Sequence, residues 1–163
     1  MTDPSRISLK ADVQGLMLTH ANKHSSDGLS PALTAVQWEV LASYMQPMTL
    51  TQGQKLIEQG AQDRTLYLIE NGSLSVHFED DKGRVRLAIV NSGSAVGEGA
   101  FFTHNPRSAT VQAAGASRIW SLAPIRFTEL ANRHPAVALE LALALGSLVA
   151  RRLVNKPKRI AVT

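Results

Sequence analysis

The chain has 163 residues, of which 44% are hydrophobic and 5% aromatic, enough for one domain with a largely aliphatic core. It contains no cysteine, which excludes disulfide scaffolds and thiolate metal sites. The net charge of +4 arises from five basic residues within 151–159, because the rest of the chain holds 12 basic and 13 acidic residues. We therefore interpret the basicity as a solvated C-terminal segment that complements a helix dipole, in preference to a nucleic-acid or lipid patch.

The start of the chain is polar, and we expect no export signal there. Its first 20 residues lack a basic stretch followed by an apolar run. We predict a flexible arm over residues 1–29 that can include a short helix over about 9–18. His20 and His24 have the i, i+4 spacing of a helical metal pair, but no third ligand lies nearby, so we expect both to be solvated.

Helical spacing begins after Ser30 and Pro31, which resemble an N-cap followed by a first-turn proline. The apolar residues that recur at this spacing are Leu33, Val36, Val40, Leu41 and Tyr44. They predict an amphipathic helix over about 31–45.

From Met48 the apolar period changes to two, which is typical of strands. One predicted strand, over about 74–79, alternates apolar and polar residues. The next places Val85, Leu87 and Ile89 on one face, and we expect Leu87 in the core whatever the function. Turn residues separate the runs at 51–53, 71–72, 80–83 and 91–93. Short strands at such spacing indicate an antiparallel sandwich or roll.

After Pro124 the spacing is helical again, with a short helix that ends before Pro135 and a longer one over about 136–154. The longer helix is apolar almost all round, so we expect the roll and a second copy of itself to cover it. Its most apolar run, residues 136–150, is too short to cross a bilayer and contains Glu140, so we expect a cytoplasmic protein without membrane contact.

These patterns predict a mainly β fold with flanking α-helices. The expected architecture is an antiparallel, jelly-roll-like β-roll with an N-terminal helix and two C-terminal helices. We expect a flexible arm over 1–29, a folded domain over 30–155 and a basic tail over 156–163.

One segment, residues 96–111 (VGEGAFFTHNPRSATV), holds the residues that point to chemistry. Its glycine-rich turn opens into a short helical stretch, and such a turn aims backbone N–H groups at an anion. Glu98 lies at this turn and Arg107 begins the next strand, so their side chains can converge across the loop. An arginine provides a positive fork for a phosphate, and a glutamate accepts hydrogen bonds from a sugar hydroxyl. The alternative is that Glu98 and Arg107 pair with each other and close an empty loop.

The segment resembles the phosphate-binding cassette of cyclic nucleotide-binding domains, with its G-E-x-A and P-R-[AST]-A-T-V motifs. The family includes kinase regulatory subunits, nucleotide-gated channels and the bacterial catabolite activator protein. The resemblance covers about residues 31–155, including L-I-E-Q-G at 56–60 and A-R-R-L at 150–153. It implies that residues 30–155 form a cyclic nucleotide-binding domain, with two C-terminal helices of the family's B and C type.

The implied ligand is cAMP or cGMP, and no other cofactor is expected. By resemblance, Glu98 binds the ribose 2′-hydroxyl and Arg107 pairs with the cyclic phosphate. The other cassette positions that the resemblance places at the ligand are Gly97, Gly99, Ala100, Ser108 and Ala109. Ser108 is compatible with either base, and a cyclic dinucleotide also stays open.

The resemblance also assigns residues outside the cassette. Val76, Leu87 and Val96 form the apolar wall around ribose and purine. Arg152 reaches the pocket from the C-terminal helix and meets Glu98 or the base, although one more helical turn than in the catabolite activator could carry it past the site.

The sequence departs from the family at Gly99, where an apolar residue usually couples the cassette to the helices. Phe101 and Phe102 are the alternative source of that contact. The resemblance implies a sensor whose C-terminal helices move over the purine. Its output would pass to an unknown protein partner or across a homodimer formed through the C-terminal helix.

Three other functions stay open. The chain can be the ligand-binding fragment of a transcription regulator or channel, although we expect no DNA-binding domain because about ten residues follow Leu153. An enzyme of the cupin type needs clustered metal ligands, and His77, His104 and His134 stand on separate predicted elements, so we expect no enzyme. The third is a degenerate domain that binds no nucleotide and serves only in interactions.

Overall fold

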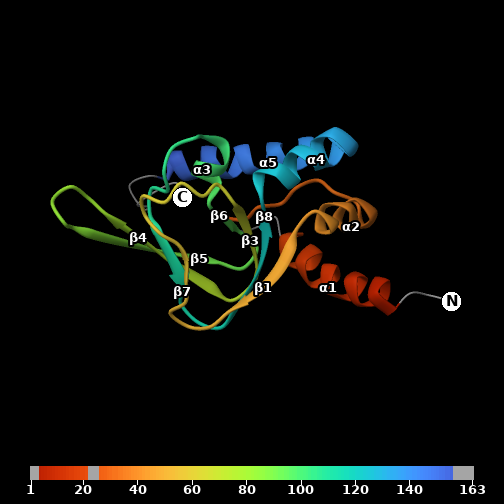
Figure 1. The fold of residues 1–163 in the computed structure, drawn as a ribbon, viewed down its shortest axis with the longest axis horizontal. Helices are drawn as coiled ribbons and strands as arrows, with labels where there is room; N and C mark the ends of the chain where they lie inside the picture. Colours follow the sequence, from red (N-terminus) through yellow and green to blue (C-terminus); the bar gives the residue numbers. More distant parts are fainter. Residues whose placement is uncertain (1–3, 22–25, 156–163) are drawn as a thin grey trace.

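The computed structural model describes residues 4–21 and 26–155 (Figure 1). His24 and the predicted tail over 156–163 lie outside these ranges. Two four-stranded antiparallel sheets have the orders β1-β8-β3-β6 and β2-β7-β4-β5. The strands are β1 Gln46–Leu50, β2 Lys55–Ile57, β3 Leu66–Asn71, β4 Ser73–Glu79, β5 Val85–Asn91, β6 Ala95–Val96, β7 Thr110–Ala113 and β8 Ser117–Leu122. The predicted β-roll is confirmed.

Helices flank the roll on the side of the β1-β8-β3-β6 sheet (Figure 1). They are α1 Pro4–His20, α2 Ala35–Ser43, α3 Glu98–Phe102, α4 Pro124–Arg133 and α5 Pro135–Val154. The predicted start of the second helix at Ser30 and Pro31 is wrong. Instead, Thr34 is its N-cap and exchanges hydrogen bonds with Gln37 in a capping box, which satisfies two backbone N–H groups at once.

Two hydrophobic layers hold the fold together. The first lies between the two sheets and includes Val76, Val96 and Ile119. The second lies between the β1-β8-β3-β6 sheet and the helices, with Trp120 fully buried at its centre. Successive residues of β8 therefore point into different layers, as strand geometry requires. No helix among the described residues is long and apolar enough to cross a membrane.

The orientation of β5 differs from the prediction. Leu87 is 55% exposed, so the expectation that it lies in the core is wrong. The register pairs Leu87 with His77 and Ala88 with Val76. Directly paired residues share a face of the sheet, and Val76 points inward, so Ala88 points inward with it and Leu87 points out.

The N-terminal segment also differs from the prediction of a flexible arm. α1 spans 17 residues, and Val13, Leu16 and Leu29 are buried against the helices and the first sheet. His20 is 1% exposed rather than solvated, and its ring lies 5.8 Å from that of Trp38. Residues 12–21 and 26–29 are therefore part of the folded domain.

We expect His20 to make stability depend on pH. Burial lowers the pKa of His20 from 6.5 to about 4, against the opposing effect of its Nδ1 hydrogen bond to the Leu29 carbonyl. The unfolded chain therefore binds a proton that the folded chain excludes as pH falls from about 6.5 to about 4. This effect contributes up to about 3 kcal/mol to the free energy of unfolding. The contribution is fully present above about pH 6.5 and is lost as the pH falls from about 6.5 to about 4.

Urea unfolding of the wild-type protein and of His20→Gln at pH 7.5 and 4.5 measures this effect. The variant lacks the titrating ring and should lose less stability between the two pH values. Equal losses in the two proteins would contradict the assignment.

Candidate ligand-binding site

The cassette begins at Gly97, which joins β6 to α3 in a left-handed backbone conformation with φ of 88°. A Cβ atom at this position would lie 2.7 Å from both Arg107 Nη1 and the Thr65 carbonyl oxygen. Only glycine meets the backbone and the space requirement together. The turn leaves the N–H groups of the first turn of α3 without partners inside that helix. Gly99 and Ala100 lie in this helix, as predicted from the sequence.

Arg107 points toward the cassette turn from the segment before β7. Its guanidinium is buried and donates from Nη1 to the Gly97 carbonyl at 3.1 Å. Nη2 donates to Asp63 Oδ2 at 2.6 Å and to the Thr65 carbonyl at 2.7 Å. Nε is buried and has no hydrogen-bond partner among the described residues. A buried guanidinium N–H of this kind is suited to an anion.

Asp63 holds Arg107 in place and was not found by the sequence analysis. Partial burial opposes ionisation of Asp63, but its hydrogen bonds to Arg107 and Thr65 outweigh burial and lower its pKa. The backbone N–H of Arg107 also donates to the Ala61 carbonyl at 2.8 Å. The loop over 60–65 thus fixes both ends of this arginine, and nothing near Arg107 in the sequence signals that contact.

Glu98 is completely buried and forms an ion pair with Arg152 Nη1. The alternative, in which Glu98 pairs with Arg107 and closes the loop, is therefore wrong. Arg152 therefore reaches the cassette from α5, as the resemblance implies. Arg152 is 4% exposed, so its interpretation as part of a solvated C-terminal segment is wrong. Burial alone would lower the pKa of Arg152. The nearby carboxylates of Glu98 and Asp27 outweigh burial, so the pKa is raised and the guanidinium stays charged.

The predicted apolar wall is only partly present. Val76 and Val96 are buried in the layer between the sheets, together with Ala109. Leu87 points to solvent and is not part of the wall, for the reason of strand register given above. Ser108 is exposed.

Phe101 provides the apolar contact that Gly99 cannot. It is buried, and its ring packs edge-on against Phe127 of α4 with centroids 5.2 Å apart. Phe102 is 46% exposed. Arg64, also missed by the sequence analysis, donates to the carbonyls of Ala100, Phe101 and Thr103 and caps the end of α3. The cassette is therefore packed directly against the C-terminal helices.

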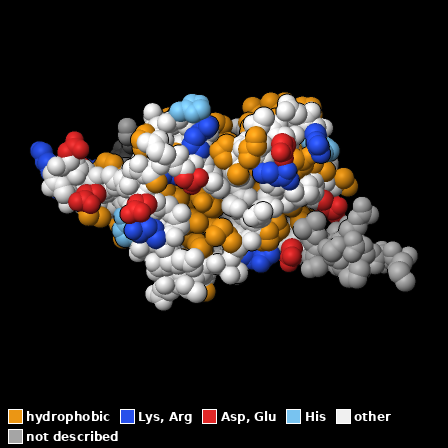
Figure 2. All heavy atoms as spheres, viewed as in Figure 1, with side chains coloured by type: hydrophobic (Ala, Val, Ile, Leu, Met, Phe, Trp, Pro, Cys, Tyr) orange, Lys and Arg blue, Asp and Glu red, His pale blue; other side chains and the backbone are white. Residues whose placement is uncertain are grey.

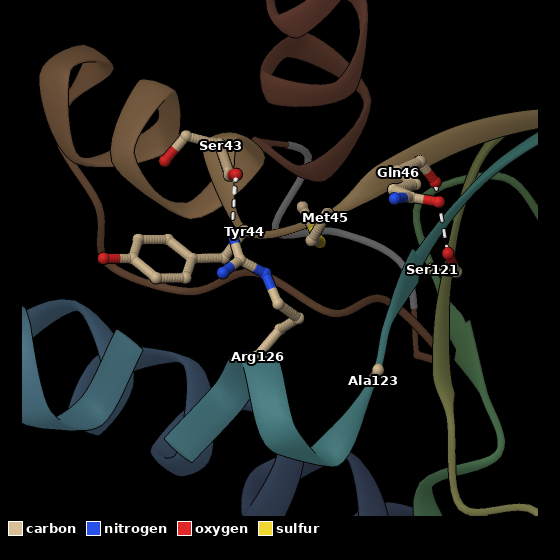
Figure 3. A pocket seen from close by; sticks show the side chains of 7 residues that line it. All are labelled: Ser43, Tyr44, Met45, Gln46, Ser121, Ala123 and Arg126. Atoms are coloured by element: carbon tan, nitrogen blue, oxygen red, sulfur yellow. Dashed lines mark hydrogen bonds between the residues drawn. The ribbon is translucent and has the colours of Figure 1, made fainter. Parts of the chain in front are cut away.

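A separate hollow of about 190 Å³ lies where α4 leaves β8 (Figure 3). Arg126 spans it, with its guanidinium 4.7 Å from the centre of the Tyr44 ring and Nη2 donating to the Ser43 carbonyl at 3.3 Å. None of the residues predicted to bind the ligand lines this hollow. Its contacts join α4 to the end of α2 instead.

The described residues contain no group of three His, Cys, Asp or Glu side chains placed to hold a metal ion. The fold presents a β-roll with a buried arginine aimed at a helix-opening glycine turn, an arrangement suited to an anion. The family model for the cyclic nucleotide-binding domain matches residues 47–134. The chain belongs to the cyclic nucleotide-binding domain family.

Comparison with known proteins agrees with this assignment. The chain is 35% identical over 75 residues to the cAMP-dependent protein kinase type II regulatory subunit of Drosophila melanogaster, covering 46% of this chain and 20% of that protein. A cyclic nucleotide-binding domain from Methylobacillus flagellatus KT shares the fold with a TM-score of 0.78 at 19% identity, covering 93% and 86% of the two chains.

The regulatory domain of Toxoplasma gondii PKA, solved with cAMP, has a TM-score of 0.61 at 25% identity, covering 79% of this chain and 46% of that one. The chain spans a quarter or less of the length of the first curated relatives that it matches.

Proposed function

We propose that this chain binds a cyclic mononucleotide, cAMP or cGMP, and acts as a sensor rather than an enzyme. The observation that carries the proposal is the buried Arg107 guanidinium, held against the Gly97 turn by Asp63 and Thr65. In this proposal Arg107 and the amides of Gly99 and Ala100 bind the cyclic phosphate. Val76 and Val96 contact the ribose and purine.

Glu98 is proposed to accept a hydrogen bond from the ribose 2′-hydroxyl. It lies on α3 beside the phosphate-binding turn, and a buried carboxylate forms strong hydrogen bonds with hydroxyl donors. Arg152 neutralises Glu98 from α5 and so connects the ribose site to the C-terminal helix.

Nucleotide occupancy is proposed to reach the helices along two contacts, Phe101 with Phe127 and Glu98 with Arg152. A ligand can shift the position of the helices only if it binds one arrangement of them more tightly than the other. This difference in binding free energy is commonly about 1–3 kcal/mol. The output is then a change in α4 and α5 that a partner or a second copy detects.

A degenerate domain is the second candidate. Both charged residues of the cassette already have protein partners, Glu98 in Arg152 and Arg107 in Asp63, so the site is electrostatically satisfied without a ligand. Calorimetric titration of the purified chain with cAMP, cGMP and cyclic di-GMP separates the two candidates. We expect saturable binding of a cyclic mononucleotide at one site per chain. No heat with any of the three would overturn the sensor and leave the degenerate domain.

We further propose a homodimer through α5. A row of exposed residues follows this helix at alternating steps of four and three, the spacing of a coiled-coil seam. Its members are Leu139, Leu143, Gly146, Ala150 and Leu153. Figure 2 shows hydrophobic side chains along the helical end of the molecule where α4 and α5 lie. A Cβ at Gly146 would meet nothing within 4 Å, so this row leaves room for close approach of a second helix.

Leu143→Glu should convert this dimer to a monomer, because a dimer would bury the introduced charge without a partner. Sedimentation velocity measures the change. Leu87→Glu is the matched control, since Leu87 is similarly exposed but lies on β5, and it should leave the dimer intact. A wild-type monomer, or a Leu143→Glu dimer, would contradict the interface.

A further inference from the structure

Residues 26–29, here called the N-terminal clamp, lie across the end of α5. Arg151 donates to two of their backbone carbonyls, those of Ser26 at 3.2 Å and Gly28 at 2.6 Å. The clamp is anchored to the roll by Leu29, which is fully buried and donates its N–H to the Gly93 carbonyl at 2.8 Å. The clamp thus joins the N-terminal part of the chain to the C-terminal helix.

Asp27 of the clamp shares Arg152 with Glu98. Asp27 accepts from Arg152 Nε at 2.9 Å and from Nη2 at 3.3 Å, whereas Glu98 accepts from Nη1. Nη2 also donates to Ser94 Oγ at 3.1 Å and to the Ala95 carbonyl at 2.9 Å. Ser94 in turn donates to Asp27 Oδ2 at 3.3 Å. One guanidinium therefore has two carboxylate partners, one in the cassette and one in the clamp.

We propose that Asp27 is a positioning residue of the nucleotide site: it holds Arg152, and with it the end of α5, against the roll independently of Glu98. This inference rests on the proposed function of Glu98 as the ribose ligand. It makes the N-terminal clamp a third element, beside the cassette and α5, whose position is linked to nucleotide occupancy.

A ligand would affect the two ion pairs of Arg152, with Glu98 and with Asp27, in different ways. A ribose hydroxyl that binds Glu98 competes with Arg152 for the same carboxylate. Asp27 is outside the cassette, and its two hydrogen bonds with Arg152 form a fork that this competition leaves intact. Arg152 then stays neutralised and α5 stays seated while Glu98 turns to the ribose. Without Asp27, Arg152 has Glu98 as its one carboxylate partner among the described residues, and the end of α5 leaves the roll more often.

Asp27→Asn tests this inference, because it removes the charge and keeps the size of the side chain. In the nucleotide-free protein we expect backbone hydrogen exchange over residues 148–154 to become about tenfold faster. Protection of β3 and β8 should not change, which shows that the roll is folded. Because fewer molecules then have α5 in place, affinity for the mononucleotide should fall in proportion to the fraction that keeps α5 seated, a smaller factor than the change in exchange.

Asp12→Asn is the matched control. Asp12 is also an acidic residue of the N-terminal part, but its arginine partner, at 3.5 Å, is Arg118 of β8 rather than a residue of α5. It should leave exchange over 148–154 and nucleotide affinity unchanged. A second variant, Arg152→Gln, should produce the faster exchange by itself, and adding Asp27→Asn to it should have no further effect.

Unchanged exchange over 148–154 in Asp27→Asn would overturn the inference, and so would tighter nucleotide binding, which would make the clamp an obstacle to the ligand. The exchange measurement needs no ligand. If the wild-type protein binds no cyclic nucleotide, the proposed function fails, and exchange in the free protein still decides whether Asp27 holds α5.

Discussion

Replacing Arg107 by alanine should weaken cyclic mononucleotide binding at least about 100-fold, equivalent to about 3 kcal/mol. Arg107 is the cation proposed to meet the cyclic phosphate, and its Nε is buried without a partner among the described residues. Truncation removes this charge-assisted contact and leaves Asp63 without its arginine. Calorimetric titration of the variant beside the wild-type protein measures the loss.

Two further variants define the cause of that loss. Arg107→Lys keeps the charge but not the planar fork, so its affinity should lie between those of the wild type and the alanine variant. Arg84→Ala removes an exposed arginine that pairs with Asp80 away from the cassette, and it should bind like the wild type. If Arg107→Ala binds cAMP or cGMP as tightly as the wild type, the assignment of the site is wrong.

Glu98→Gln should abolish the ability to distinguish cAMP or cGMP from its 2′-deoxy analogue. A hydrogen bond to a buried carboxylate contributes about 1.5–3 kcal/mol, so the wild-type protein should prefer the 2′-hydroxyl form by about 10- to 100-fold. The variant should bind both forms within about threefold of each other. Competition titration with the two nucleotides measures this ratio.

The ratio isolates the ribose contact from the change in α5. Loss of Glu98 also removes a partner of Arg152, which should lower the affinity for both nucleotides together. Glu58→Gln, at an exposed glutamate paired with Lys55, is the matched control and should keep the wild-type ratio. A Glu98→Gln protein that still prefers the 2′-hydroxyl form would show that Glu98 does not contact the ribose.

The local patterns of the sequence predicted most of the elements. Strands appeared where apolar residues alternate, and the two C-terminal helices lie where helical spacing returns after Pro124. Both signals are local, because period two and period 3.6 depend only on residues within one element. The cassette could be identified by its resemblance to a family motif, because its glycine turn, Glu98 and Arg107 fall within one short segment.

Alternation failed at β5, where both faces carry apolar residues. Val85, Leu87 and Ile89 alternate with Ala88 and Val90, so the pattern shows which residues share a face but not which face is inside. Pairing with β4 made that choice by setting Ala88 opposite Val76. A pairing register is a property of two strands and cannot be obtained from one.

The sequence also failed to predict that the N-terminal segment packs on the domain. Polar composition suggested an arm over 1–29, yet Leu16, His20 and Leu29 are buried because α1 packs against the roll and α2.

By itself, then, the sequence determined the β-roll with its flanking helices and placed Glu98 and Arg107 in one short segment. Only the tertiary structure decided that Asp63 holds Arg107 and that Asp27 is a second carboxylate partner of Arg152, because these pairs lie 44 and 125 positions apart in the chain. The pairing of Arg152 with Glu98 was implied by the family resemblance and by no local pattern. Local periodicity carries no information about such contacts, whereas the position of a buried charge is set by whatever folding brings beside it.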